Sequence, residues 1–161
     1  MKFVGIDPGV TGAIALLPDE TIWDTPVILI NGKRSYQPVA MARIIQEILD
    51  GAGDEEVMVA LERQQAFPRQ GSVSTGSIMR GYGLWEGILA AVGVAYSCPR
   101  PQEWQRAIGR AAGKDKGASV QRAQQLFPRF TARWKKNDHG KSDALLLAAY
   151  AQRGFTKPTE V

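Results

Sequence analysis

The sequence predicts an α/β protein with a mixed sheet, and three features of the chain support this prediction. Short apolar runs separated by turn residues come first, apolar segments at helical spacing then alternate with further short runs, and the last third is helical. Strands joined by short turns pair as an antiparallel meander, whereas strands separated by a helix are added in parallel. We therefore expect a mixed five-stranded sheet, with three antiparallel strands followed by parallel additions, flanked by helices.

The first third of the chain supplies the expected meander. Residues 2–7 form an apolar run closed by a Pro-Gly turn, and residues 13–17 form a second strand after a short connection. A third extended segment lies within residues 21–30, where Pro26 marks a sheet edge or a strand end. The polar and basic residues 31–37 are expected to form a loop.

Helices and strands then alternate, and the C-terminal part is helical. The expected strands are residues 57–61 and 94–98, and the expected helices are residues 39–49, 74–92, 101–108, 118–127 and 138–153. A loop rich in Gly and Lys, residues 109–117, separates two of these helices. The centre of the last helix, ALLLAAYA, is apolar nearly all round and is therefore expected to be buried.

The size and composition are those of one globular domain, residues 1–161. The chain is 44% hydrophobic and 22% charged, and it has no run of about 20 apolar residues of the kind that spans a membrane. The first residues lack the pattern of a signal peptide, and the single cysteine, Cys98, is expected to be a core thiol. These features predict a reducing, cytoplasmic location.

Charge is divided unevenly along the chain. Residues 1–99 carry 7 Lys and Arg against 11 Asp and Glu, whereas residues 100–161 carry 13 against 5. A basic C-terminal part favours a polyanionic partner, although many basic surfaces serve only solubility.

Two carboxylates stand at the ends of predicted buried strands. Asp7 ends the first strand, where it is also a common turn residue, and Glu62 ends the strand of residues 57–61, where it is also an ordinary exit to the surface. If the two strands are neighbours, both carboxylates meet at one point. Such an oxygen-rich site suits a hard divalent cation such as Mg²⁺.

A third acidic group and the only histidine begin the last predicted helix. Asp143 is also placed to complement the helix dipole, and His139 lies four residues before it on the same face. Asp138 lies five residues before Asp143 and is interpreted first as an N-cap. We prefer His139 to Asp138 as the fourth member of the site.

These residue types fit the hydrolysis of a phosphodiester. The reaction needs an activated water, a stabilised phosphorane oxyanion and a stabilised leaving oxygen, and two divalent cations about 4 Å apart supply all three. Three or four carboxylate or imidazole ligands from separated chain segments are needed to hold such a pair. We therefore take Asp7, Glu62, Asp143 and His139 as candidate catalytic and metal-binding residues.

Three stretches, GIDPGVTG (residues 5–12), LERQQAF (61–67) and HGKSDALLLA (139–148), resemble the catalytic segments of the RuvC-type Holliday junction resolvases. The stretch of residues 101–128 resembles the bacteriophage branch of that family, and the likeness covers nearly the whole chain. It implies an RNase H-like fold, a homodimer, and nicking of opposing strands of a four-way DNA junction with two Mg²⁺ or Mn²⁺ ions per site. It also implies a role in DNA recombination and repair, with a host cytoplasm as the location if the protein is viral. One position departs from the family, because Gly140 stands three residues before Asp143, where the better-known members have Asp or His.

Further residues are candidates for contacts with DNA. Phe67 either stacks on an unpaired base or anchors its own loop. Basic residues around the carboxylates would attract a polyanion, although each alone is an ordinary surface charge. They are Arg63, Arg69, Arg80, Arg110, Lys114, Lys116, Arg129, Arg133, Lys135 and Lys136. Gly76, Gly83 and Gly87 weaken the helix of residues 74–92 and suggest close packing, either at a twofold interface or on the sheet.

Other functions remain as alternatives. A sugar-kinase or actin-like ATPase shares a phosphate loop like GIDPGVTG, but it needs two such domains, so no nucleotide cofactor is expected. The remaining alternatives are a YqgF-type or RNA–DNA hybrid nuclease and a branched-DNA-binding protein without catalysis. The presence of Asp7, Glu62 and Asp143 together argues against the last of these.

Overall fold

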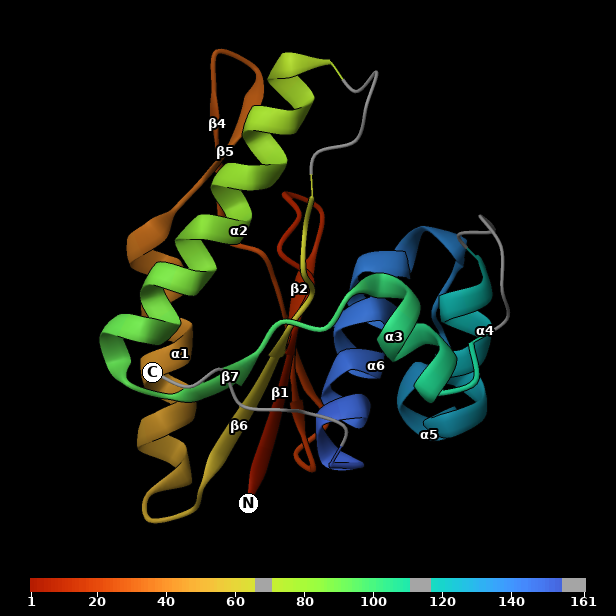
Figure 1. The fold of residues 1–161 in the computed structure, drawn as a ribbon. Helices are drawn as coiled ribbons and strands as arrows, with labels where there is room; N and C mark the ends of the chain where they lie inside the picture. Colours follow the sequence, from red (N-terminus) through yellow and green to blue (C-terminus); the bar gives the residue numbers. More distant parts are fainter. Residues whose placement is uncertain (66–70, 111–116, 155–161) are drawn as a thin grey trace.

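The computed structural model describes residues 1–65, 71–110 and 117–154, and a mixed five-stranded sheet forms its centre (Figure 1). The sheet order is β3-β2-β1-β6-β7. Its strands are β1 (Lys2–Ile6), β2 (Ala13–Leu17), β3 (Thr21–Asp24), β6 (Val57–Leu61) and β7 (Ala95–Ser97). β2 runs antiparallel to β1 and β3, whereas β1, β6 and β7 are parallel. The predicted mixed sheet is therefore confirmed.

A separate β-hairpin replaces the loop predicted for residues 31–37. Strands β4 (Val27–Ile30) and β5 (Lys33–Tyr36) pair antiparallel around Asn31 and Gly32, both of which have positive φ angles. An Asn-Gly pair is the preferred sequence for a tight two-residue hairpin turn, so the local signal was present. The prediction failed because the polar and basic composition of this stretch was given more weight than its turn residues.

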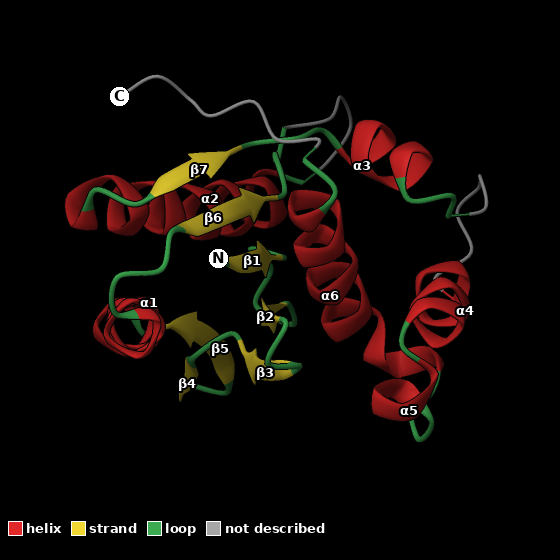
Figure 2. Cartoon of the chain, turned by 90° about the horizontal axis from the view of Figure 1, so that it is seen from below, coloured by secondary structure: helices red, strands yellow, loops and turns green. Residues whose placement is uncertain are grey.

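Helices cover both faces of the sheet (Figure 2). On one side lie α1 and α2, and on the other α6 lies against the sheet with α3, α4 and α5 beyond it. The helices are α1 (Pro38–Ala52), α2 (Ser72–Val92), α3 (Pro101–Ala107), α4 (Gly117–Leu126), α5 (Pro128–Thr131), the 3₁₀ helix η1 (Lys136–Asp138) and α6 (His139–Gln152). Among the described residues, no helix has both the length and the hydropathy needed to cross a membrane.

The contact between α6 and β1 is unusually close, and Gly5 makes it possible. A Cβ atom placed on Gly5 would lie 2.0 Å from the Ala144 carbonyl oxygen and 2.3 Å from the Ala148 nitrogen. Helix backbone therefore packs directly on strand backbone at the centre of the sheet. The middle of α6 is fully buried by this arrangement, as its apolar sequence predicted.

We expect Gly5→Ala to destabilise the protein by about 3 kcal/mol or more, because overpacking against a rigid backbone cannot be relieved by a side-chain movement. Urea unfolding followed by circular dichroism measures the change. Gly51→Ala is the matched control, since a Cβ at Gly51 meets nothing within 4 Å and a helical alanine stabilises by up to about 1 kcal/mol. Equal stability of the Gly5 variant and the wild type would contradict the packing argument.

Candidate active site

Three carboxylates from distant parts of the chain come together at one edge of the sheet. Asp7 follows β1 and Glu62 follows β6, and these parallel neighbours end in register, with Ile6 opposite Leu61. The Glu62 N–H still donates to the Ile6 carbonyl at 3.0 Å, which ties the second strand end to the first. Asp143 precedes Ala144, whose carbonyl faces Gly5, so the close helix contact brings this third carboxylate to the same edge.

Burial raises the pKa values of all three groups, and repulsion between carboxylates adds to this effect for Asp7 and Glu62. Burial, followed by the charge of Asp143, raises the pKa of Asp7 to about 7. Burial, followed by the charges of Asp7 and Asp143, raises the pKa of Glu62 to about 8. Burial also raises the pKa of Asp143, against the opposing effects of Ser119, Arg110 and His139. Each pair of carboxylates therefore interacts across a poorly solvated space.

The Asp7 carboxylate is held by the turn that follows β1. Its Oδ1 accepts a hydrogen bond from the Gly9 N–H at 3.1 Å. Gly12 packs against the same residue, because a Cβ there would lie 2.2 Å from the Asp7 carbonyl oxygen and 2.9 Å from its Cγ. The glycines of the GIDPGVTG stretch thus let the turn close around the aspartate.

Both oxygens of Glu62 have neutral donors. The Trp104 indole Nε1 donates to Oε1 at 3.1 Å, and the Gln64 amide Nε2 donates to Oε2 at 2.7 Å. Trp104 is fully buried on α3, so the carboxylate is oriented by a rigid group from the helical layer. These two hydrogen bonds lower the pKa of Glu62 and partly offset the effect of burial.

Asp143 is oriented by a chain of polar contacts from α4. Buried Ser119 forms a hydrogen bond with Asp143, which lowers the pKa of the carboxyl group. The Ser119 Oγ in turn accepts from the Arg110 Nε at 2.7 Å. Within the described part of the chain, Asp143 Oδ1 is buried and has no hydrogen-bond partner.

This set of oxygens fits a divalent cation in its chemistry. A buried carboxylate oxygen without a partner, beside two further carboxylates with raised pKa values, is a poor arrangement unless positive charge enters it. Hard oxygen donors are the ligands that Mg²⁺ and Mn²⁺ prefer. Among the described residues, however, no three His, Cys, Asp or Glu side chains already stand where they could hold one ion together. Binding would require side-chain adjustment.

The fourth position differs from the pattern of the RuvC-type resolvases that the chain resembles, and the reason is steric. A Cβ on Gly140 would lie 2.3 Å from the Thr11 carbonyl oxygen, so a side-chain ligand is excluded there. His139 acts electrostatically on Asp143 and lowers its pKa. Asp138 occupies the N-cap position of α6 but makes no side-chain cap; its Oδ2 instead accepts from the Lys135 N–H at 2.8 Å. Asp138 therefore has the predicted position but not the predicted capping hydrogen bond. That His139, and not Asp138, is the fourth member of the site stays a prediction.

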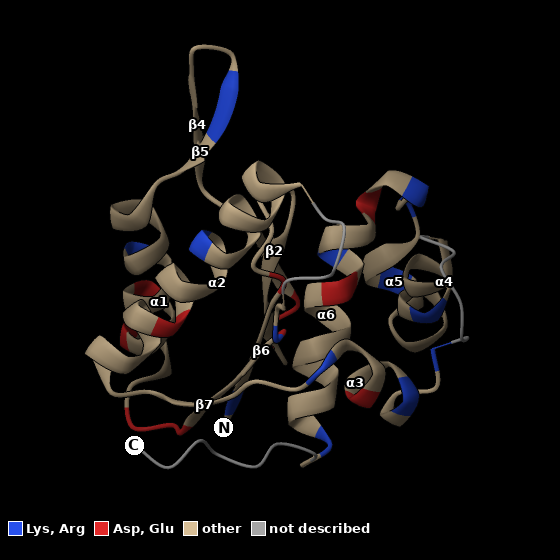
Figure 3. Ribbon diagram, turned by 45° about the horizontal axis from the view of Figure 1, so that its top comes forward, with Lys and Arg blue, Asp and Glu red and all other residues tan. Residues whose placement is uncertain are grey.

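The predicted DNA-contact residues are distributed over several elements. Arg63, Arg80, Lys135 and Lys136 are exposed, and segments bearing Lys and Arg recur along α3, α4 and α5 (Figure 3). Phe67, Arg69, Lys114 and Lys116 lie outside the described residues.

Sequence reasoning missed the groups that orient the carboxylates. Trp104 and Ser119 carry no local motif that identifies them as neighbours of Glu62 or Asp143, and Gln64 lies within LERQQAF but was not singled out. Arg110 was singled out only as a phosphate contact, whereas its Nε supports Ser119. Only the position of Gln64, two residues beyond Glu62, offered a signal.

Without divalent cations, we expect the melting temperature to fall between about pH 5 and pH 8. Folded Asp7 and Glu62 keep protons up to pH values near 7 and 8, whereas the unfolded chain releases them near 4, so folding binds protons in this window and weakens as the pH rises. Thermal unfolding in EDTA and in Mg²⁺ or Mn²⁺ measures the effect. The cation should stabilise more at pH 8 than at pH 5, and Glu62→Gln should flatten the profile; a flat wild-type profile in EDTA would contradict the argument.

The sequence and the fold were compared with those of known proteins. No family model matches the chain. The chloroplastic Holliday junction resolvase MOC1 of Chlamydomonas reinhardtii is 28% identical over 152 residues, covering 81% of this chain but only 17% of that protein. Thermus thermophilus RuvC in complex with a Holliday junction substrate aligns with a TM-score of 0.60 and 18% identity, covering 99% of this chain and 100% of that one. A second T. thermophilus RuvC structure gives 0.55 and 20%, with the same coverage. The chain therefore has the RNase H-like fold of RuvC, with the strand order and flanking helices described above.

Proposed function

We propose that the protein is a metal-dependent endonuclease that nicks opposing strands of four-way DNA junctions. The observation that supports this most strongly is the convergence of Asp7, Glu62 and Asp143 at the rim of a sheet with the RuvC fold. The similar MOC1 and RuvC proteins are described as a Holliday junction resolvase and as bound to a Holliday junction. The likeness of residues 101–128 to phage members further suggests the bacteriophage branch and a role in recombination and repair.

Asp7, Glu62 and Asp143 are the residues that would hold Mg²⁺ or Mn²⁺, with His139 beside them. Two such ions, when bound, supply an activated water and stabilise charge on the attacking and leaving oxygens. The chain's own groups hold the ligands in place, because Gly9 fixes Asp7, Trp104 fixes Glu62 and Ser119 fixes Asp143. The enclosing elements limit the access of water, so charge interactions at the site are strengthened.

DNA would reach the site from its basic surroundings. Basic residues recur along the helical layer of α3 to α5, with Arg106 on α3, Arg122 on α4 and Arg129 on α5 (Figure 3). Positive charge near an acidic centre concentrates a polyanion that the carboxylates alone would repel. The predicted contacts through Phe67, Arg69, Lys114 and Lys116 remain part of this proposal.

The assay for this function uses a synthetic four-way junction, a linear duplex and an RNA–DNA hybrid, each with Mg²⁺, Mn²⁺ or EDTA. We expect paired nicks in the junction alone, only with a divalent cation. Asp7→Asn should lower the cleavage rate by at least about 10³-fold and preserve junction binding, because the change removes a charge and keeps the shape. Cleavage confined to the hybrid would favour an RNase H activity, and binding without any cleavage would favour a non-catalytic protein.

His139→Ala should reduce cleavage more than Asp138→Ala does. His139 interacts with Asp143, whereas the Asp138 carboxylate is occupied by the Lys135 N–H and lies near Lys141. Single-turnover rates at saturating Mg²⁺ measure the difference, and melting temperatures exclude unfolding. A larger loss with Asp138→Ala would move the fourth site role to that residue.

A homodimer is part of the proposal, and α2 supports it. The helix buries only Gly81, Trp85 and Leu89, while Gly76, Gly83 and Gly87 face open space. Light scattering after gel filtration should give the mass of two chains. Gly83→Glu should shift the protein to monomer, whereas Gly51→Glu on α1, also in open space, should not. A monomeric wild type at micromolar concentration would contradict the dimer.

A further inference from the structure

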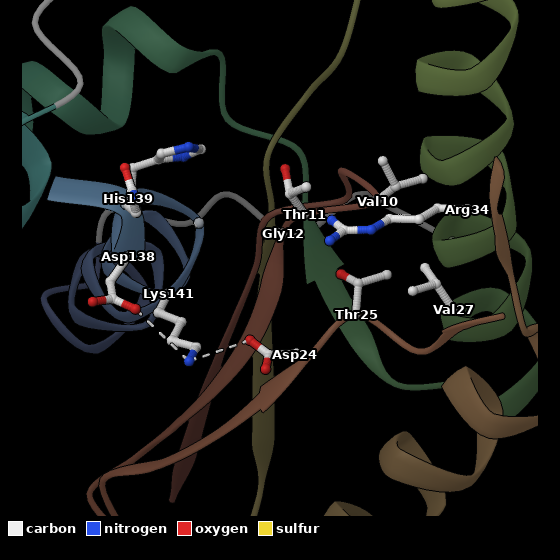
Figure 4. A pocket seen from close by; sticks show the side chains of 12 residues that line it. Val10, Thr11, Gly12, Asp24, Thr25, Val27, Arg34, Asp138, His139 and Lys141 are labelled. Carbon is white, nitrogen blue, oxygen red and sulfur yellow. Dashed lines mark ion pairs between the residues drawn. The ribbon is translucent and has the colours of Figure 1, made fainter. Parts of the chain in front are cut away.

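A polar pocket lies beside the candidate active site, and Asp7, Glu62 and Asp143 are not among the residues that line it (Figure 4). Its volume is about 530 Å³, and it opens between the β1–β2 turn, the base of the β4–β5 hairpin and the start of α6. The residues that matter most to its chemistry are Thr11, Thr25, Arg34, His139 and Lys141. Gly12 lines the pocket and also packs against Asp7, and the candidate site residue His139 lines the pocket as well, so the pocket adjoins the candidate active site.

Thr25 supplies the first indication that this pocket receives a ligand. The residue is 4% exposed, and its Oγ1 is buried without a hydrogen-bond partner in the described part of the chain. Its backbone is fixed, because the Thr25 N–H donates to the Gly12 carbonyl at 3.0 Å. Figure 4 shows the hydroxyl beside the Arg34 guanidinium, within the pocket. A buried hydroxyl without a partner is unfavourable, and a ligand oxygen would satisfy it.

Arg34 supplies the second indication, which is charge. On β5 it shares a face with Tyr36, whose hydroxyl donates to the Pro8 carbonyl at 3.1 Å and so ties the hairpin to the β1–β2 turn. The Arg34 side chain extends past Val10 and Val27 and ends near Thr11 (Figure 4). Among the described residues, the Arg34 side chain has no ion-pair or hydrogen-bond partner, although the backbone of Arg34 belongs to the β4–β5 ladder opposite Leu29. Its planar group therefore presents free donors to the pocket.

The acidic residues of the pocket are balanced by a different cation. Lys141 Nζ lies 3.6 Å from Asp24 Oδ1 and 3.8 Å from Asp138 Oδ1 (Figure 4). The Arg34 charge is thus left for an incoming anion. The N-terminus of α6, where the helix dipole is positive, lines the same pocket. A guanidinium with two neighbouring hydroxyls matches the oxygens of a phosphate.

We propose that this pocket binds a phosphodiester group of the DNA strand. This group is the neighbour, on the same strand, of the phosphodiester that is cleaved. The proposal rests on the nuclease function, because it assumes that a strand crosses the carboxylates. Arg34 and Thr25 are the binding residues, and the β4–β5 hairpin is the element that carries the arginine to the strand. The pocket therefore fixes the position of the DNA strand along the candidate active site. It contacts the sugar-phosphate backbone of the DNA and leaves the bases uncontacted.

Junction binding in Ca²⁺, which we expect to support binding without cleavage, tests Arg34 first. Arg34→Gln should weaken binding about tenfold, the effect of losing a charge-assisted contact, and reduce the salt dependence by about one phosphate. Lys33→Gln is the matched control, since it changes the same charge on the neighbouring residue of β5, which points to the other face. It should change binding less than about twofold. Equal effects of the two variants would overturn the proposal.

Thr25→Val separates binding from folding. Valine has the same shape without the unpartnered hydroxyl, so the melting temperature should stay equal or rise. Binding should nevertheless weaken about threefold, because the ligand loses a donor. A fall in stability together with unchanged binding would show that the hydroxyl is structural, and would overturn the role of Thr25 in the pocket.

Junctions with one neutral methylphosphonate at successive positions identify the phosphate. One position beside the cleaved bond should weaken wild-type binding and have no further effect on Arg34→Gln, which a double-mutant cycle detects as coupling. Coupling to an abasic nucleotide instead, or coupling at no position, would overturn the phosphate pocket. The two proposals fail separately: coupling without cleavage in Mg²⁺ would reject only the nuclease, whereas cleavage without coupling would reject only the pocket. A wild type that binds no DNA would reject both.

Discussion

The direct packing of α6 on β1 at Gly5 is the constraint on which the rest of the structure depends. Backbone touches backbone there, because a Cβ would lie 2.0 Å from the Ala144 carbonyl oxygen. Asp143 is the residue before Ala144, so the same contact that completes the core also sets the position of a carboxylate. The parallel pairing of β1 with β6 then brings Asp7 and Glu62 to the same edge. The packing of α6 and β6 against β1 therefore forms the core and also sets the positions of the three carboxylates.

The carboxylates of the candidate site repel one another, and hydrogen-bond donors from other helices partly offset this repulsion. Burial raises the pKa values of all three carboxyl groups, neighbouring carboxylates raise those of Asp7 and Glu62 further, and folding must overcome that cost. Donors from the second half of the chain reduce it, since Trp104 of α3 binds Glu62 and Ser119 of α4 binds Asp143. The helices beyond α6 thus contribute to the site directly, in addition to carrying basic charge.

Much of the fold followed from sequence because local signals and burial agree. The run VMVAL and the all-apolar centre of α6 each have one plausible structure, and both were predicted. The β4–β5 hairpin was missed, since its strands are short and exposed and only the Asn31-Gly32 turn marks them. Asp7, Glu62 and Asp143 stood out by their places at element ends. Trp104, Ser119 and Thr25 did not, because their roles come from contacts between segments far apart in the chain.

The burial of α6 also determines how the site can be lost. Ten of its residues, Gly140, Ser142 and the unbroken run from Ala144 to Ala151, are buried, so the helix that carries Asp143 belongs to the interior of the molecule. Amide protons in such a segment exchange with solvent only when the whole domain opens. Fraying or loop motion elsewhere leaves the carboxylate in place. Heating should therefore remove the candidate active site and the native fold in a single cooperative step.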